Sequence, residues 1–284
     1  MAIRFPSNIA ISVLLLFGGA LGAYNASSND FRFAILGDRT GEAQPGVYEE
    51  AWHETDADHP DFVITTGDTI QGENDLTMDK EWQRVLQLLA PYRKYRIFFI
   101  PGNHDVWSIA SAQAFEKYTK RPLHYGFNFK QAHFVVLDDS RSDQLPAEEL
   151  AFLRNDLEAN KRQSLKFVFS HRPTWLIQVV FSNPNFPLHQ LAKRYGVKYV
   201  IAGHLHQMQH YELDGITYLL LASSGGHLRD SKQYKDGWFF QHTLVTVHDQ
   251  SVDFRIKELA PPFGQGRITR PADWGPSGLE NSSK

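Results

Sequence analysis

The chain has 284 residues, of which 42% are hydrophobic and 21% charged, a balance typical of a folded globular protein. Its formal net charge is -3, so the protein offers no broad basic surface to a polyanion, and we expect no nucleic-acid partner. A small phosphorylated substrate stays compatible with this charge, because a bound metal supplies local positive charge. The chain contains no cysteine, which excludes disulfides and a lipid-modifiable thiol.

Residues 1–23 have the organisation of an export signal peptide. Arg4 lies in a short basic start, an apolar stretch follows from Ile9 to Phe17, and small residues fill positions 18–23. A retained membrane anchor is the alternative, but the apolar run is shorter than the roughly 20 residues that a spanning helix needs. The sequence therefore predicts an exported, periplasmic or secreted protein with no transmembrane span after cleavage. Residues 24–30 are predicted to be a linker.

Between residues 31 and 259, short apolar segments alternate with amphipathic ones, the pattern of β-α-β units in a mixed α/β domain. Met78, Trp82, Val85 and Leu89 recur on one face of a predicted helix, which Pro91 ends. The predicted strands are 31–36, 61–65, 96–100, 134–137, 165–169 and 197–202.

The second half of the chain contains another predicted helix and then a change of pattern. The helix begins at Pro146 and carries Leu150, Leu153 and Leu157 on one stripe. From Gln209 onward, short apolar segments follow one another as in an antiparallel meander. Residues 260–284 are rich in Pro, Gly and Ser, so we expect a C-terminal tail that is at most an ordered strap.

Residue types that bind metals follow five of the predicted strands. The segments are Gly37-Asp38-Arg39-Thr40, Gly67-Asp68, Gly102-Asn103-His104-Asp105, Ser170-His171-Arg172-Pro173 and Gly203-His204-Leu205-His206. In an open α/β sheet such strand ends lie at one carboxyl edge, where ligands bind. The six side chains that could share a mixed oxygen and nitrogen site for two divalent cations are Asp38, Asp68, Asn103, His171, His204 and His206.

Each motif also has a structural explanation. Gly-Asp after a strand is a common turn, because Gly takes positive φ and Asp hydrogen-bonds its own backbone. Asn103 to Asp105 could cap the next helix, and His171 could be a core histidine. No single structural role accounts for all six side chains at one edge, which favours the metal site.

The ordered set GD, GD, GNHD, SH and GHLH resembles the motifs of the calcineurin-like metallophosphoesterase family, over roughly residues 31–258. The resemblance implies a four-layer αββα sandwich, in which two packed β-sheets are flanked by helices. It also implies a hydrolase, a phosphatase or a phosphodiesterase, that uses two metal ions to activate water for attack on phosphate mono- or diesters.

Carried over residue by residue, the resemblance assigns the metal ligands and the acid catalyst. Asp68 would bridge both ions, Asn103, His171 and His204 would complete one shell, and Asp38 and His206 would hold the other ion. His104 would protonate the leaving oxygen or stabilise the transition state, and Asp105 would orient His104.

Two further residues are candidates for substrate binding. Arg39 could clamp a phosphate with two hydrogen bonds, or it could point outward and pair with a surface acid. His227 ends a glycine-rich segment and could contact substrate or lie in an exposed loop. The apolar segment 175–187 could form a lid over an organic leaving group or pack on the body of the domain.

The sequence departs from the family pattern at the first metal. The family's first motif reads Asp-x-His, whereas Thr40 occupies the histidine position here. Purple acid phosphatases, a related branch, carry a tyrosine three residues after the second-motif aspartate, where this chain has Gln71. We therefore expect a labile first metal, with water or Gln71 filling the gap, and Mn²⁺, Mg²⁺ or Zn²⁺ rather than a charge-transfer iron site.

The leading hypothesis is a metal-dependent phosphoesterase. The rival is a non-catalytic phosphate- or metal-binding protein on the same fold, because the first metal site has lost a ligand. His104 favours the enzyme, since a binding protein needs no proton donor there. An exported nuclease fits the chemistry but lacks the basic groove that a nucleic-acid strand requires.

Overall fold

The computed structural model describes residues 29–274, so the expected signal peptide and the end of the expected tail lie outside the described residues. One group of strands comprises β1 (Phe31–Leu36), β2 (Phe62–Thr65), β3 (Arg96–Phe98), β10 (Gln241–His248), β11 (Ser251–Glu258) and β12 (Ile268–Thr269). The other comprises β4 (Tyr125–Phe129), β5 (Ala132–Val136), β6 (Leu165–Phe169), β7 (Tyr199–Ala202), β8 (Gln209–Leu213) and β9 (Ile216–Leu220).

The helices fall into two groups along the chain. The first group is α1 (Val47–Ala57), α2 (Met78–Leu88) and α3 (Ile109–Thr119), and the second is α4 (Ala147–Ala159), α5 (Leu176–Val180) and α6 (Pro187–Tyr195). Short 3₁₀ segments are η1 (Ala90–Tyr92), η2 (Tyr234–Asp236) and η3 (Pro271–Asp273). The predicted helices at Met78 and after Pro146 are confirmed as α2 and α4.

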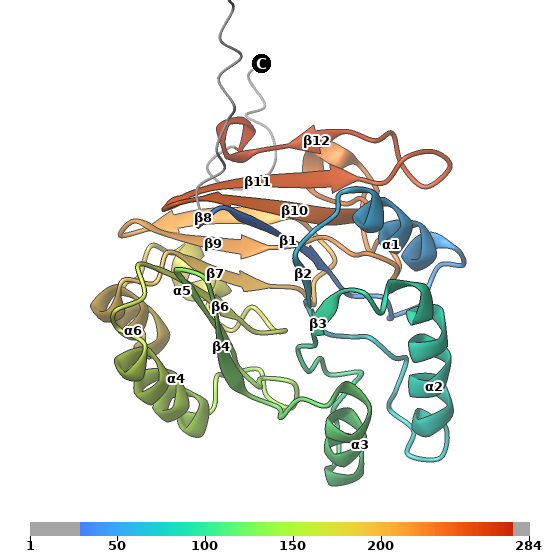
Figure 1. Cartoon of the computed structure of the whole chain (residues 1–284), viewed down its shortest axis with the longest axis horizontal. Helices are drawn as coiled ribbons and strands as arrows, with labels where there is room; N and C mark the ends of the chain where they lie inside the picture. The colour runs from blue at the N-terminus through green and yellow to red at the C-terminus, as the bar shows by residue number, and fades with distance from the viewer. Residues whose placement is uncertain (1–28, 275–284) are drawn as a thin grey trace, which may run out of the picture.

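Two six-stranded sheets pack face to face, with the two groups of helices on opposite outer sides (Figure 1). The strand orders are β12-β11-β10-β1-β2-β3 and β4-β5-β6-β7-β9-β8. This arrangement confirms the expected four-layer αββα sandwich.

Side-chain alternation divides the apolar residues between three cores. In β1, Phe33 and Ile35 enter the core between the sheets, whereas Ala34 and Leu36 belong to the core beneath α1, α2 and α3. The core between the sheets is rich in aromatic rings, with Phe33 and Phe62 stacked at a centroid distance of 5.2 Å. Burial on both faces explains why these strands are almost continuous apolar runs.

The parallel strands bring the sequence motifs to one edge. β1 pairs in parallel with β2, and β2 with β3, while β5, β6, β7 and β9 form a parallel series in the second sheet. The chain therefore leaves β1, β2, β3, β6 and β7 toward the same side of the sandwich. Because the two sheets are packed against each other, motifs from both sheets meet there.

The last third of the chain differs in detail from the predicted meander. β8 and β9 form an antiparallel hairpin in the second sheet, where β9 also pairs in parallel with β7. β10 and β11 instead join the first sheet beside β1, and β12 extends that sheet. The meander is thus shared between the two sheets, because the chain crosses from one sheet to the other between β9 and β10.

The apolar segment 175–187 packs on the second sheet. Trp175, Val179 and Phe186 are buried in the core beneath α4, α5 and α6, whereas Ile177 and Phe181 are exposed. Its buried side chains support packing rather than a lid. Across residues 29–274, no helix is both long enough and apolar enough to span a membrane.

Candidate functional site

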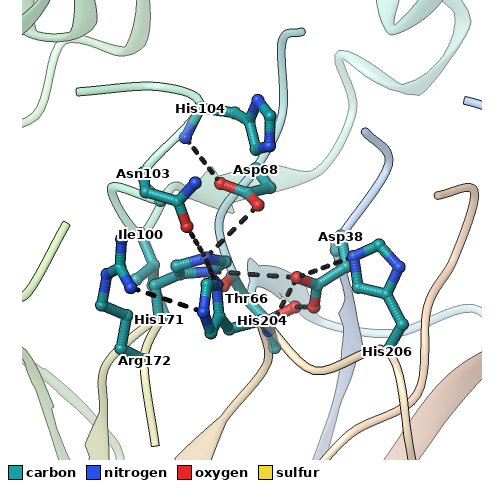
Figure 2. A network of polar contacts seen from close by, with 12 residues as sticks. Asp38, Thr66, Asp68, Ile100, Asn103, His104, His171, Arg172, His204 and His206 are labelled. Carbon is teal, nitrogen blue, oxygen red and sulfur yellow. Dashed lines mark hydrogen bonds and ion pairs between the residues drawn. The ribbon is translucent and has the colours of Figure 1, made fainter. Parts of the chain in front are cut away.

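Polar side chains from four motifs meet around the imidazole of His171, which follows β6 (Figure 2). The His171 Nε2 atom lies 3.3 Å from Asp68 Oδ2 and 3.0 Å from Asn103 Oδ1. The same Nε2 lies 3.1 Å from Nδ1 of His204, which follows β7. The structure therefore brings together four of the six predicted metal ligands, and one potential ligand atom of each faces a common point.

The His171 ring is oriented by contacts that leave this Nε2 atom facing the cluster. Its Nδ1 lies 2.8 Å from the Thr66 carbonyl, so an Nδ1–H donates to that oxygen. The backbone N–H groups of His171 and Arg172 both donate to Asp139 Oδ1, each at 3.0 Å. Asp139 is buried, and this burial raises the pKa of its carboxyl to about 6. The Thr66 carbonyl thus fixes the His171 ring, and the Asp139 carboxylate fixes its backbone.

The charges around His171 Nε2 favour the binding of a cation. Burial raises the pKa of Asp68, but the positive charge of His171 outweighs burial and holds that pKa below its usual value. Burial lowers the pKa of His171, but the carboxylates of Asp68 and Asp38 raise it to about 10, so a proton lies among the acceptor atoms. Burial, followed by the charges of His171 and Arg172, lowers the pKa of His204 to about 3, so this ring is neutral.

The donor set fits a divalent metal ion. Ligand atoms of Asp68, His171 and His204 all lie within 4.8 Å of one another. One carboxylate, two imidazoles and the amide oxygen of Asn103 are ligand types that zinc, manganese and related ions accept. The proton on His171 occupies the position where a cation would balance the same carboxylates. These four residues could therefore hold one ion.

Asp38 and His206 lie beside this cluster and form a less complete second position. His206 Nε2 is 3.8 Å from Asp38 Oδ1, and it is buried without a hydrogen-bond partner among the described residues. His206 Nδ1 lies 2.8 Å from the His227 carbonyl, which leaves Nε2 directed at Asp38. Asp38 also accepts the His204 backbone N–H at 2.8 Å. An unpaired imidazole nitrogen beside a carboxylate could bind a second cation.

A main-chain carbonyl joins each of Thr40 and Gln71 to the candidate site. Thr40 is buried, and its hydroxyl donates to the Asp68 carbonyl at 3.1 Å. The Gln71 carbonyl lies 2.6 Å from His104 Nδ1, while the residue as a whole is exposed. The contact that the structure shows for Gln71 is that of its main-chain carbonyl, and filling of the gap by its side chain stays a prediction.

Backbone strain accompanies the candidate ligands. Asp38, Asp68, His204 and His206 have positive φ angles of 51°, 53°, 74° and 61°. Non-glycine residues seldom adopt this conformation, and strain of this kind concentrates at functional sites. Close packing adds a further restriction, because a Cβ on Gly102 would lie 2.2 Å from Asp68 Oδ1. The glycine of the GNHD motif is therefore required by the approach of the Asp68 carboxylate.

His104 lies next to Asp68 (Figure 2) and is half-buried, whereas Asp68 is buried. Its backbone N–H donates to Asp68 Oδ1 at 2.9 Å, which ties the two motifs together. An Nδ1–H donates to the Gln71 carbonyl at 2.6 Å, so Nε2 is the atom available to a substrate. This geometry suits a proton donor held by its main chain to a metal ligand.

Asp105 has a different role from the one expected. It is fully buried, and one carboxylate oxygen accepts the backbone N–H groups of Thr69 and Ile70 at 2.8 and 3.0 Å. The other oxygen accepts the N–H of Gly102 at 3.0 Å. Burial, and then the charge of Asp68, raise the pKa of Asp105 to about 7. The carboxylate thus holds the GD loop against the GNHD loop, and the Gln71 carbonyl orients His104 instead.

The Arg39 guanidinium contacts both the loop after β2 and helix α1. Its Nη1 donates to the Thr69 carbonyl at 3.2 Å, and the guanidinium carbon lies 5.7 Å from the Tyr48 ring centroid. Arg39 therefore packs on α1, and its phosphate clamp stays a prediction. His227 donates from Nδ1 to the Gly41 carbonyl at 2.7 Å, and its own carbonyl orients His206. Its main chain thus supports a candidate ligand.

The sequence reasoning assigned no role to three residues that support the site. Thr66 and Asp139 hold His171, and Arg172 places its guanidinium 3.4 Å from His204 Nε2. The available signal for Arg172 was its position directly after His171. Thr66 likewise precedes the Gly-Asp pair of the second motif.

Comparisons with known proteins agree with this fold and motif set. The profile of the Calcineurin-like phosphoesterase family matches residues 31–208, which is more than half of the chain. The chain is 25% identical over 218 residues to the 3',5'-cyclic adenosine monophosphate phosphodiesterase CpdA of Haemophilus influenzae, a match that covers 70% of this chain and 75% of that protein. It is 26% identical over 216 residues to human tartrate-resistant acid phosphatase type 5, covering 62% and 64% of the two proteins.

Solved structures show the same fold at lower identity. The purple acid phosphatase PPD1 from yellow lupin superposes with a TM-score of 0.66 at 15% identity, over 85% of this chain and 53% of the lupin protein. GAP50, the anchor in the inner membrane complex of Plasmodium, superposes with a TM-score of 0.58 at 16% identity, over 84% and 86% of the two chains. This chain thus spans about half the length of the lupin enzyme.

The family and its purple acid phosphatase neighbours imply a dinuclear metal site, in agreement with the two cation positions above. The relatives are named as a phosphodiesterase and as a phosphatase, so they support a phosphoesterase hydrolase without selecting an ester. The chain belongs to the calcineurin-like phosphoesterase family.

Proposed function

We propose that this protein is an exported, metal-dependent phosphoesterase that hydrolyses phosphate mono- or diesters of small molecules. One observation carries the proposal: Asp68, Asn103 and His204 each direct a ligand atom to within 3.3 Å of His171 Nε2. Export rests on the basic start and the apolar run of residues 1–23.

Asp68, Asn103, His171 and His204 would hold the tighter ion, and Asp38 and His206 would hold the weaker one. When bound, such ions would supply a more acidic water and neutralisation of phosphoryl charge. We propose Mn²⁺, Mg²⁺ or Zn²⁺, because these ions accept mixed oxygen and imidazole ligands and the chain has glutamine at the position of the purple-enzyme tyrosine.

His104 is proposed as the general acid. Its Nδ1–H is held by the Gln71 carbonyl, so the imidazole cannot rotate freely. A proton on Nε2 would then be available to the leaving oxygen of the ester. The hydrogen bond from its main chain to Asp68 keeps the acid at a fixed place relative to the metal ligands.

A non-catalytic phosphate- or metal-binding protein is the second candidate. The observation that favours it is the incomplete Asp38 and His206 position, beside which Thr40 uses its hydroxyl on a backbone carbonyl. The two candidates differ at His104, because binding alone does not require a proton donor.

Turnover of two chromogenic esters tests the proposal. The protein is stripped with a chelator, reloaded with Mn²⁺, and assayed with p-nitrophenyl phosphate and bis-p-nitrophenyl phosphate. We expect one of them to be hydrolysed only by the reloaded protein, and the preferred ester distinguishes monoesterase from diesterase. Asp68→Ala should lose both metal and turnover. Stoichiometric Mn²⁺ binding without turnover of either ester would leave the binding protein as the explanation.

A further inference from the structure

A guanidinium group borders the candidate metal cluster on the side of the second sheet. Arg172 Nη1 lies 3.4 Å from His204 Nε2, on the other side of the ring from the Nδ1 that faces His171 (Figure 2). The Arg172 side chain is 21% exposed, so it is held by protein but remains accessible to a small ligand. The guanidinium carbon of Arg39, the other candidate, lies 5.7 Å from the Tyr48 ring centroid.

The base of this side chain is fixed. The Arg172 backbone N–H donates to the buried Asp139 carboxylate, which also accepts the N–H of the ligand His171. Its Nε–H donates to the Ser140 carbonyl at 3.3 Å. The guanidinium is therefore built on the same rigid turn as a metal ligand, and little side-chain entropy is lost when it binds an anion.

The outer part of the guanidinium is available. Nη2 makes no hydrogen bond to any residue in the range 29–274, and Nη1 pairs at 2.7 Å with Asp143, whose side chain is 91% exposed. An ion pair with so exposed a carboxylate contributes little, so exchange for another anion costs little. The contact to His204 is at the long limit of a hydrogen bond, and it is similarly weak.

We propose that Arg172 binds a non-bridging oxygen of the substrate's phosphoryl group, and so acts as the phosphate-binding arginine of this site. This inference rests on the phosphoester function proposed above and adds a residue to it. A guanidinium offers two parallel N–H groups to phosphate oxygens, and such charge-assisted pairs are among the stronger hydrogen bonds in proteins.

Phosphate affinity tests the proposal without depending on turnover. Binding of inorganic phosphate to the Mn²⁺-loaded full chain is measured by titration calorimetry for the wild type, Arg172→Ala and Arg172→Gln. We expect the phosphate Kd to rise roughly 10- to 100-fold in both variants, the loss typical of a hydrogen bond to a charged group. Bound Mn²⁺, measured by elemental analysis, should be unchanged.

Arg141→Ala is the matched control. Arg141 lies on the neighbouring loop, pairs with Asp138 at 2.9 Å and is 45% exposed, so its loss removes one positive charge without touching the cluster. Its phosphate Kd should stay within about twofold of the wild type, because exposed charges act weakly at a distance. An equal loss in the Arg141 and Arg172 variants would overturn the proposal, because general charge would then explain it.

The remaining outcomes separate this inference from the function. Unchanged phosphate affinity in Arg172→Gln, in an enzyme that turns over, would overturn the arginine's role and leave the function intact. If the wild type hydrolyses neither ester and the Arg172 variants still bind phosphate more weakly, the proposed function would be overturned and the role of Arg172 in phosphate binding would stand. Loss of Mn²⁺ in the Arg172 variants would also overturn the proposal, since Arg172 would then position His204.

Discussion

Replacing Asp105 tests whether this residue is a scaffold or part of the acid catalyst. In Asp105→Ala, three buried backbone N–H groups, those of Thr69, Ile70 and Gly102, lose their acceptor. An unsatisfied buried donor costs roughly 1–3 kcal/mol, so even the low end gives about 3 kcal/mol of lost stability. That is a large fraction of the roughly 5–15 kcal/mol that stabilises a typical protein.

Asp105→Asn provides the matched comparison. Its single amide oxygen can still accept the two N–H groups of Thr69 and Ile70, and only the Gly102 N–H then faces a donor. We expect a loss of roughly 1–3 kcal/mol, clearly smaller than for alanine. Urea unfolding, followed by tryptophan fluorescence after chelation, measures both values without a contribution from bound metal.

The result that would refute this reasoning is a stable Asp105→Ala protein with full metal content and strongly reduced turnover. Asp105 would then act through His104, as the resemblance of the motifs to the family implied. A scaffold role predicts instead that turnover falls in proportion to the folded, metal-loaded fraction. Unlike Asp105→Ala, His104→Ala should keep the free energy of unfolding within about 1 kcal/mol of the wild type. The reason is that the His104 ring is hydrogen-bonded only at Nδ1 in the described structure.

Three more outcomes follow from the geometry. His104→Ala should lower turnover at least about 100-fold at full metal content, the usual range for a general acid, and loss of metal in this variant would show that its role is misassigned. His204→Ala should abolish the tighter metal equivalent in a Mn²⁺ titration, whereas His206→Ala should remove only the weaker one; equal effects of both would contradict two unequal sites. Gly203→Ala adds no charge but should impair metal binding, because its Cβ would lie 2.1 Å from Asp38 Oδ2. Normal metal content in this variant would refute the close approach of Gly203 to Asp38.

Much of the fold could be predicted because it depends on local pattern. The strands 31–36 and 165–169 have the predicted bounds, and α2 ends close to Pro91 as the helical periodicity indicated. The division of the late strands between two sheets could not be predicted, because the apolar pattern of a strand does not say which sheet it joins. Which sheet each strand joins depends on pairing with β7 or β1, far away in the sequence.

The candidate site was predictable in composition more than in geometry. Asp68, Asn103, His171 and His204 could be grouped because all four follow strands of a β-α-β pattern, which pair in parallel. Their positions along the strands do not reveal that Asp139 fixes the His171 backbone, or that Gln71 holds His104 by a carbonyl. Each of these contacts has a main-chain atom of a loop as one partner, and a main-chain atom carries no residue-specific signal.

By itself, the sequence determined the alternation of strands and helices, the type of each candidate ligand and its place at a strand end, because these follow from hydrophobic period and residue chemistry. Only the tertiary structure decided the directions of the side chains. It turned Arg39 onto α1, buried Asp105 among backbone amides and placed Arg172 beside His204. The physical reason is that these directions are set by hydrogen bonds across about 30 residues or more, such as those of Asp105 to Thr69 and of Arg172 to Ser140.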